Sequence, residues 1–444
     1  MNLRPAALSM IAACALAAPS DAEQANDPLT LINAPPFEMR SQGEAVIVAV
    51  VDSGVDWFHA AGPRDRLWRN PGEIAGDGVD NDRNGHVDDV IGWNVMGPDN
   101  RPWDYLGHGT FVASLIAGGR EPLAPAARIM VVKALGDFGD ADHSGLAAGV
   151  RYAADNGARV INLSLGGDGS TPEVAEAISY AARLDALVVI AAGNTAAPIA
   201  PGFGPAGHPD AITVGAVNAS GRLAGYSSWG HGVDLVAPGE TIVSARARGT
   251  DFLRRFALRE RAAYASGSAV RGSEGRFYEA SGTSFAAPFV TAAAATLRSQ
   301  RPELSAGEVK RMLVQSARDI QFPGVDEFSG YGLIDLAAAL DADPDFFLDA
   351  RINRISVTGS GRQQAAEIVG TADASRFRRA RIEIGRGEDP QVWTKAASAD
   401  RGRNAPIARV PASAFAGGGV WTVRLIVEHK NQRERETRIV LRLG

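Results

Sequence analysis

Disulfide bonds and long apolar runs are both lacking in this chain of 444 residues. Its single cysteine, Cys14, has no second cysteine with which to pair, so no disulfide within the chain can add rigidity. A transmembrane helix needs about 20 consecutive apolar residues, and the apolar run near the N-terminus is shorter than that. We therefore expect no transmembrane segment.

The composition and the charge distribution indicate two globular parts. Hydrophobic residues make up 45% of the chain and charged residues 22%, which is ordinary for a folded protein, and the length exceeds that of one average domain. From Asp345 onward the chain carries 18 basic and 11 acidic residues, a net charge of +7, which leaves −13 for the part before it. Opposite net charges favour docking of the two parts, and a basic C-terminal part also suits contact with an anionic cell surface.

Residues 1–18 have the pattern of a secretory signal peptide. A basic residue precedes a short alanine-rich apolar run, and small residues near its end fit the rule for a cleavage site. We expect a bacterial protein that is secreted or periplasmic. Residues 11–14 also resemble a bacterial lipobox, so lipid anchoring through Cys14 is the alternative. Residues 19–42 are polar and contain prolines, which predicts an extended N-terminal arm.

Three short motifs contain a carboxylate, an imidazole and a serine hydroxyl, the groups that are needed to make serine a nucleophile. Asp52 follows an apolar, β-branched run at residues 46–51, which places a carboxylate at the end of a buried strand. His108 and Ser284 each stand where a helix of small residues opens. A serine is a weak nucleophile until an imidazole takes its proton, and the imidazole needs a carboxylate to fix its tautomer. Taken alone, Ser284 is equally well explained as a helix N-cap.

The three motifs resemble the signature blocks of the subtilisin-like serine proteases. They read VVDSG at 50–54, HGT at 108–110 and GTSFAAP at 282–288, in the order Asp, His, Ser. The resemblance implies that Asp52 orients His108 and that His108 acts as general base and then general acid for Ser284. It also implies that Asn194, at the end of an apolar strand, donates with the Ser284 N–H to the oxyanion. A simple turn residue is the alternative for Asn194.

Strands and helices alternate over most of the chain. Apolar strands are expected at 129–134, 160–164, 187–191 and 212–217 in addition to 46–51, and helices at 111–118, 144–156, 172–184 and 305–316, with a last helix that starts in 330–335 and ends at 340. Such alternation predicts an α/β fold, with a doubly wound, mostly parallel sheet flanked by helices, which we assign to residues 43–340. Residues 341–350 read as a linker. Short alternating runs in 351–444 predict a smaller all-β domain of the β-sandwich type.

Substrate-binding residues are implied by the resemblance alone. Ser164, Leu165 and Gly166 follow a predicted strand and resemble the family segment that pairs with the substrate backbone as an added strand. The loop at 138–142 would form the other edge of the cleft. Ala192 and Gly193 would form the floor of the first specificity pocket. Their small size would leave room there for a sizeable apolar side chain of the substrate.

An acidic stretch between the Asp52 and His108 motifs indicates a structural calcium ion. The candidate ligands are Asp80, Asp82, Asn84, His86 and Asp88. Their alternate spacing, with Gly85 at the sharp turn, matches the opening of an oxygen-rich calcium loop. The twelfth position is Ile91 instead of the bidentate glutamate of an EF-hand, so the loop is not a complete EF-hand. A solvated acidic turn is the alternative.

Residues 245–278 are longer than the expected connection into the Ser284 motif. Surface insertions cost little free energy, so we predict a solvated insertion, with a lid or substrate-facing arm as the alternative. The activity expected from all these features is that of a secreted serine endopeptidase acting on polypeptides through an acyl-enzyme. The alternatives are a transacylase or macrocyclase, in which an amine captures the acyl-enzyme, and a non-catalytic surface-binding protein. No nucleic-acid partner is expected.

Overall fold

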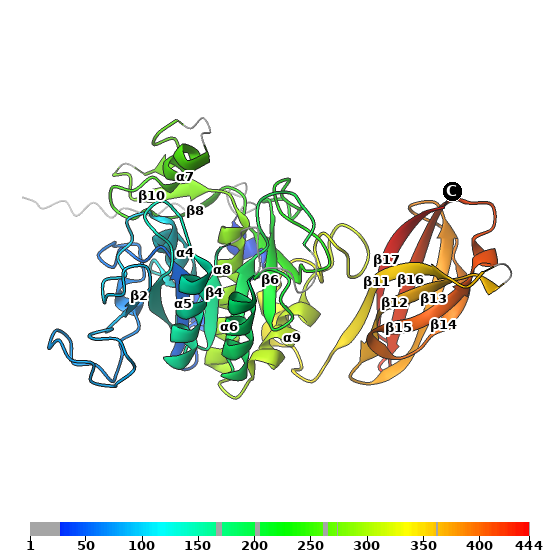
Figure 1. The fold of residues 1–444 in the computed structure, drawn as a ribbon, viewed down its shortest axis with the longest axis horizontal. Coiled ribbons are helices and arrows are strands. Elements are labelled where there is room, and N and C mark those ends of the chain that lie inside the picture. The colour runs from blue at the N-terminus through cyan, green and yellow to red at the C-terminus, as the bar shows by residue number, and fades with distance from the viewer. Residues whose placement is uncertain are drawn as a thin grey trace, which may run out of the picture.

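The computed structural model describes residues 27–165, 171–199, 205–260, 265–272, 274–360 and 363–443. The predicted signal peptide, and with it Cys14, lies outside the described residues. Two parts follow one another along the chain, a large α/β domain and a smaller β domain, and Figure 1 shows them side by side along the long axis of the molecule.

A seven-stranded sheet forms the centre of the first domain. Its strands are β1 (Val46–Asp52), β2 (Gly92–Asn94), β3 (Ala127–Lys133), β4 (Val160–Leu163), β5 (Leu187–Ala191), β6 (Ala211–Val217) and β7 (Leu235–Pro238), in the order β2-β3-β1-β4-β5-β6-β7. Every pairing between neighbouring strands of this sheet is parallel. The strands are short apolar runs buried on both faces, as expected for a parallel sheet covered by helices.

Helices cover both faces of the sheet because successive side chains of a strand point to opposite sides. In β1, Val48 and Val50 belong to the core shared with α4 (His108–Ala117), α8 (Thr283–Gln300) and α9 (Ala306–Ser316). Ala49 and Val51 belong instead to the core shared with α5 (His143–Asp155) and α6 (Pro172–Arg183). Figure 1 shows α5 and α6 side by side on the near face. This arrangement confirms the predicted doubly wound α/β fold.

The last helix of this domain is shorter than predicted. Only α10 (Leu336–Leu340) is helical, and residues 330–335 run in an irregular path. Gly332 has φ +115°, and a Cβ at this position would lie 2.1 Å from the carbonyl oxygen of Arg318. This close approach demands glycine and prevents an earlier helix start. The helix begins where Asp335 accepts a hydrogen bond from the Ala338 N–H at 2.9 Å.

The described part of the N-terminal arm is not simply extended. It contains two four-residue helices, α2 (Pro28–Leu31) and α3 (Phe37–Arg40). Asp27 caps α2 by accepting N–H hydrogen bonds from its first turn. The buried guanidinium of Arg40 donates to the carbonyl oxygens of Pro35 at 2.8 Å and Leu123 at 2.9 Å, and thereby fastens the arm to the domain.

The C-terminal domain consists of two antiparallel sheets around one apolar core. One sheet contains β11 (Leu348–Thr358), β12 (Ala365–Ala374) and β15 (Gly402–Pro411), and the other β14 (Thr394–Ala399), β13 (Phe377–Arg386), β16 (Gly419–His429) and β17 (Glu434–Leu443). Alternate apolar residues of both sheets meet in this core. The predicted all-β domain is therefore present, and its first strand begins at Leu348, two residues before the expected end of the linker.

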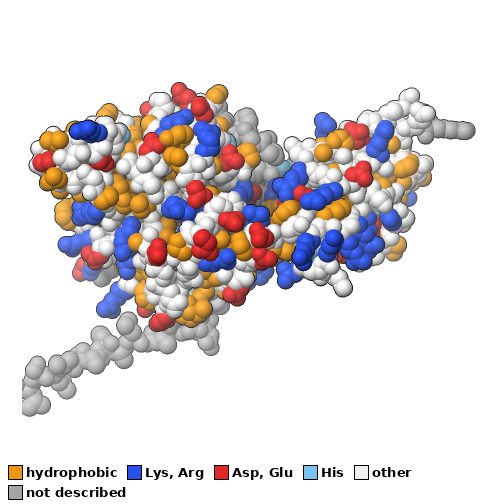
Figure 2. Space-filling model, turned by 90° about the horizontal axis from the view of Figure 1, so that it is seen from below, with side chains coloured by type: hydrophobic (Ala, Val, Ile, Leu, Met, Phe, Trp, Pro, Cys, Tyr) orange, Lys and Arg blue, Asp and Glu red, His pale blue; other side chains and the backbone are white. Residues whose placement is uncertain are grey.

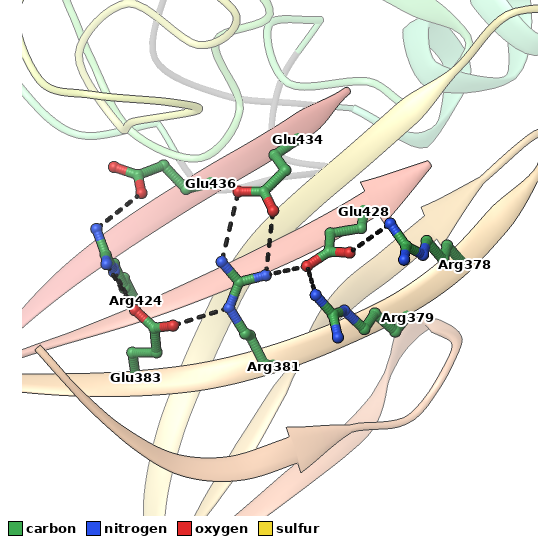
Figure 3. Close-up of polar contacts among 8 residues, drawn as sticks. All are labelled: Arg378, Arg379, Arg381, Glu383, Arg424, Glu428, Glu434 and Glu436. Atoms are coloured by element: carbon green, nitrogen blue, oxygen red, sulfur yellow. Dashed lines mark hydrogen bonds and ion pairs between the residues drawn. The ribbon is translucent and has the colours of Figure 1, made fainter. Parts of the chain in front are cut away.

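The outer face of the four-stranded sheet carries an array of ion pairs, which Figure 3 shows in detail. Arg381 stands at its centre and donates to Glu383 at 2.8 Å, to Glu434 at 3.3 Å and to Glu428. Glu428 also accepts from Arg379 at 2.7 Å. Side chains that stand opposite one another on neighbouring strands interact in this way because they share one face of the sheet.

The two domains dock through a tyrosine held between two arginines. The guanidinium groups of Arg351 and Arg435 lie 4.8 and 4.9 Å from the ring centroid of Tyr331, whose hydroxyl donates to Asp349. Figure 2 shows that Lys and Arg side chains gather on the C-terminal domain, in keeping with its net positive charge. None of the described helices is long and apolar enough to cross a membrane.

Candidate active site

The carboxyl end of β1 and the start of α4 bring Asp52 and His108 together. The Nδ1 atom of His108 lies 2.8 Å from Oδ1 of Asp52 and 3.0 Å from Oδ2. Both side chains are buried. A carboxylate in this position fixes the imidazole tautomer that carries hydrogen on Nδ1 and leaves Nε2 free to accept a proton.

A second buried carboxylate, Asp104, holds this arrangement in place. It accepts hydrogen bonds from the Ser53 hydroxyl at 2.8 Å, from the Gly107 N–H at 2.6 Å and from the Thr110 N–H at 2.8 Å. These contacts tie the first turn of α4 to the end of β1. Sequence reasoning missed Asp104, which lies three residues before Gly107, the N-cap of α4.

Opposing effects set the pKa of His108. Burial disfavours the charged imidazolium and lowers the pKa, but the negative charge of Asp52 and its hydrogen bond raise it, with a further contribution from Asp104. The net pKa of His108 lies above its ordinary value. For Asp104, burial raises the pKa, and hydrogen bonds from Thr110, Gly107 and Ser53 oppose that shift.

Ser284 lies in the first turn of α8, on the same side of the molecule as His108. The ring of the next residue, Phe285, lies 5.4 Å from the imidazole of His108 and 4.4 Å from the ring of Phe111 in α4. The Ser164 hydroxyl donates to the carbonyl oxygen of Ser284 at 2.7 Å. Two helix starts and the end of a strand thus converge at one edge of the sheet, where ligands of parallel α/β folds bind.

The amide of Asn194 is oriented by the residue before Ser284. The Thr283 N–H and hydroxyl donate to Oδ1 of Asn194 at 2.8 and 3.0 Å, and the Gly193 N–H donates to the Thr283 hydroxyl at 3.0 Å. Because Oδ1 is held by Thr283, the NH2 group is the part of Asn194 that can donate to a developing oxyanion. Thr283 was not singled out in the sequence, and only the folded contacts show its role.

Four of the five predicted substrate-binding residues lie in the described part of the chain. Ser164 is buried and accepts from the Asn162 amide at 2.9 Å, and Leu165 is partly buried on the α5 and α6 side. Gly166 lies outside the described residues. Ala192 is buried at the end of β5, and Gly193 has φ +105°, a conformation that favours glycine.

The insertion at 245–278 is a folded unit beside His108. It contributes to a three-stranded antiparallel sheet of β8 (Ile242–Ala245), β10 (Phe277–Ala280) and β9 (Val270–Arg271), and it contains α7 (Phe252–Glu260). Figure 1 shows these elements projecting from one end of the domain. Phe252 is 2% exposed, and its ring lies 5.6 Å from the imidazole of His108. The prediction of a solvated insertion is wrong for this part, because Phe252 and Tyr278 are buried and Phe252 packs against His108.

The acidic stretch gathers three carboxylates, only one of which was among the predicted ligands. Oxygen atoms of Glu73, Asp82 and Asp89 lie within 4.8 Å of one another. The amide of Asn70 donates to Asp82 at 2.9 Å and to Asp89 at 2.8 Å. Burial raises the pKa of Asp89, while hydrogen bonds from Tyr152 and the asparagines oppose that shift. A compact set of hard oxygen ligands fits calcium.

The other predicted calcium ligands are Asp80, Asn84, His86 and Asp88. Of these, Asp80 stays next to Asp82, because the Asn84 N–H donates to Oδ1 of both at 3.1 Å. The Asn84 amide donates to Asp82 at 3.2 Å and so stays close to the three carboxylates. Asp80 and Asp88 accept backbone N–H groups of their own loop, and the ring of His86 lies 4.5 Å from Trp93. Glu73 precedes Asp82 by nine residues, and only the turns of the loop bring the two together.

Comparisons with known proteins agree with this geometry. The model of the subtilase family matches residues 43–332. The thermophilic serine proteinase of Bacillus sp. (strain AK1) is 34% identical over 294 residues, which cover 65% of this chain and 59% of that protein. Fervidolysin of Fervidobacterium pennivorans is 33% identical over 319 residues, 68% of this chain and 41% of that protein. This chain therefore spans about half the length of these relatives.

The crystal structure of fervidolysin shares the fold, with a TM-score of 0.55 and 24% identity, over 94% of this chain and 60% of that chain. The family match includes β1, α4 and the start of α8, and hence the elements that carry Asp52, His108 and Ser284. Since that match extends over more than half of the sequence, the chain belongs to the subtilase family.

Proposed function

We propose that this protein is a serine endopeptidase that hydrolyses peptide bonds in polypeptides. The observation that carries the proposal is the buried hydrogen bond of 2.8 Å between His108 and Asp52, beside the helix start that bears Ser284. His108 accepts the proton of the Ser284 hydroxyl as Oγ attacks the scissile carbonyl, and then gives that proton to the leaving amine. Asp52 stabilises the imidazolium that forms in between.

Water completes the reaction by attacking the acyl-enzyme, again with His108 as the base. In both tetrahedral steps negative charge develops on the carbonyl oxygen. The NH2 group of Asn194 and the N–H of Ser284 are the proposed donors to that oxyanion, because Thr283 already holds the Asn194 amide oxygen.

The proposed substrate is an extended polypeptide chain. Ser164 and Leu165 would supply one edge for backbone pairing and the turn near 138–142 the other, as an added strand requires. Ala192 and Gly193 lie at the floor of the pocket for the residue whose carbonyl is attacked. Their small side chains leave space there for a large apolar group.

Calcium is the proposed structural cofactor. Its ligands would come from Glu73, Asp82 and Asp89, with Asp80 and Asn84 next to them, while His86 and Asp88 shape the loop. When bound, the ion would neutralise three carboxylates that otherwise repel one another, and it takes no part in the chemistry at Ser284. Secretion through the first 18 residues, and contact of the basic C-terminal domain with a cell surface, are proposals from the sequence.

A mixed peptide pool, read by mass spectrometry, tests the proposed reaction. Cleaved peptides support an endopeptidase, cyclised or ligated peptides would instead show a transacylase, and unchanged peptides would contradict both. A fluorophosphonate probe should label the parent protein and leave Ser284→Ala unlabelled, since that substitution removes the nucleophile while keeping a small residue at the helix start. Labelling of the Ser284→Ala protein would contradict the assignment of the nucleophile.

A further inference from the structure

Helix α7 places two aromatic rings against the catalytic imidazole. The ring centroids of Phe252 and Phe256 lie 5.6 and 6.2 Å from that of His108, both in edge-to-face orientation. Phe252 also packs on Phe285, whose ring lies 6.0 Å away, next to Ser284. One side of His108 is therefore covered by a helix that belongs to the insertion.

The same helix is fastened to the turn that forms one edge of the proposed cleft. The guanidinium of Arg255 donates to the carbonyl oxygen of Asp137 and lies 5.3 Å from the ring centroid of Phe138. A Cβ atom added to Gly139 would lie only 2.4 Å from Cε1 of Phe256. The partly buried Phe256 ring thus lies against both the His108 imidazole and the backbone of this turn, and it narrows the space between them.

A substrate bound as an added strand would present a side chain to this space. Successive side chains of an extended chain point to opposite sides. The substrate residue that supplies the attacked carbonyl would direct its side chain into the pocket whose floor is Ala192 and Gly193. The residue before it would then direct its side chain to the opposite side of the substrate strand. In the proposed binding mode, in which the turn at 138–142 is one edge of the cleft, this second side chain would face the turn and Phe256, which lies beside Gly139 and His108.

We propose that Phe256 determines the specificity of the enzyme for the substrate residue that precedes the attacked one, and restricts it to small side chains such as Gly, Ala and Ser. The inference depends on the proposed endopeptidase function and adds a substrate class to it. Its basis is steric: the ring is held on one side by the turn and on the other by His108, so a large substrate side chain has no pocket to enter.

The test uses three chromogenic peptides, succinyl-Ala-Ala-X-Phe-p-nitroanilide with X as Ala, Leu or Phe, and the full-length protein. We expect the parent to hydrolyse the Ala peptide with a kcat/KM at least about 10-fold above that of the Phe peptide, which is within the range that a restricted apolar pocket achieves. Phe256→Ala should reduce this ratio to less than about 3-fold, chiefly by improving hydrolysis of the Leu and Phe peptides.

Two further variants make the test specific. Arg255→Ala releases α7 from the carbonyl of Asp137 without changing the ring, so it should relax the selectivity in the same direction even if Phe256→Ala folds poorly. Leu258→Ala is the matched control, because Leu258 belongs to the same helix and is 64% exposed. It should keep the ratio of the parent.

The outcomes separate this inference from the proposed function. Equal hydrolysis of the Ala and Phe peptides by the parent would overturn the inference and leave the endopeptidase intact. If Phe256→Ala raised kcat/KM equally for all three peptides, the inference would be overturned as well. Helix α7 would then limit access to the site for every substrate, without distinguishing between side chains. No hydrolysis or fluorophosphonate labelling by the parent would overturn the function, and the inference with it.

Discussion

At the scale of single residues, the buried contact between His108 and Asp52 decides how activity depends on pH. The net pKa of His108 is raised, because the charge and hydrogen bond of Asp52 outweigh the lowering effect of burial. Catalysis needs the neutral imidazole, so kcat/KM should rise with pH through this raised pKa. Asp52→Asn should move that rise to lower pH and reduce the plateau by about 10⁴-fold. The measurement is a pH profile of kcat/KM.

The free energy of unfolding should depend on pH, because folding raises the pKa of His108. A raised pKa in the folded state means that protonated His108 stabilises the fold below its ordinary pKa of about 6.5, and that this contribution is lost as pH rises through the folded pKa. In the Ser284→Ala background, the destabilisation caused by Asp52→Asn should therefore shrink as pH rises. A difference that grows with pH would contradict the role given to Asp52.

Asn194 should bind the transition state much more strongly than it binds the unreacted substrate. Asn194→Ala should lower kcat by about 10²–10³-fold with little change in KM, because its NH2 group gains a charged partner only after Ser284 attacks. Steady-state kinetics on the Ala peptide measure both constants. A loss confined to KM would indicate that Asn194 serves mainly to hold Thr283.

At the scale of secondary-structure elements, the outer face of β13, β16 and β17 should owe part of its stability to Arg381. The side chain of Glu428 is 3% exposed, and its pKa is lowered by the hydrogen bond from Arg379 and also by the charge of Arg381, although burial opposes that shift. Arg381→Met removes one partner of Glu428 and leaves Arg379. We expect the free energy of unfolding to fall by about 1–2 kcal/mol, less than the loss for a fully orphaned buried charge.

The matched control for this element is Arg442→Met. Arg442 pairs with Glu388 at 2.7 Å, but its side chain is 75% exposed, so the loss should stay below about 0.5 kcal/mol. Urea unfolding of both variants in the Ser284→Ala protein makes the comparison without self-digestion. Equal losses would mean that burial of Glu428 does not matter to this ion-pair array (Figure 3).

At the scale of the whole molecule, calcium should raise resistance to unfolding. Binding to the folded state alone stabilises by about 2.7 kcal/mol when the free ion is at a hundred times its Kd. The melting temperature of Ser284→Ala should therefore rise with calcium and fall with chelator. Asp82→Ala, which removes one of the three clustered carboxylates, should weaken the response and leave peptide hydrolysis in saturating calcium nearly normal when made in the active protein.

Asp77→Ala is the control for the calcium experiment, because Asp77 lies exposed in the same loop and outside the group of Glu73, Asp82 and Asp89. It should keep the calcium response of the parent. Identical melting curves with and without chelator in the parent would mean that the loop is a solvated acidic turn.

The docking of the two domains also belongs to this scale. Besides the contacts of Tyr331, the Val325 N–H donates to the carbonyl oxygen of Glu436 at 2.9 Å, and the Thr437 hydroxyl donates to that of Val325 at 2.7 Å. These hydrogen bonds join a loop of the first domain to the last strand of the second and help to fix their relative position. The opposite net charges read from the sequence are consistent with this docking.

The sequence by itself determined most elements of the α/β domain and the family. Apolar runs such as residues 46–51 and 187–191 became the strands β1 and β5 within about a residue of their predicted bounds. Strand and helix periodicity is local, and a parallel sheet follows from the alternation, so both can be read along the chain. The pairing of Asp52 with His108 could likewise be expected, because both lie at the same end of the sheet.

Only the tertiary structure decided which distant residues surround that pair. Asp104 holds the start of α4, Phe256 fills the space beside His108, and Glu73 meets Asp82 across turns of a loop. No periodic pattern in the sequence signals these contacts, because each depends on how the chain folds back over many residues. The insertion packs against the imidazole because burial of Phe252 and Phe256 there removes apolar surface from water. The spacing of residues along the sequence does not reveal where that favourable burial occurs.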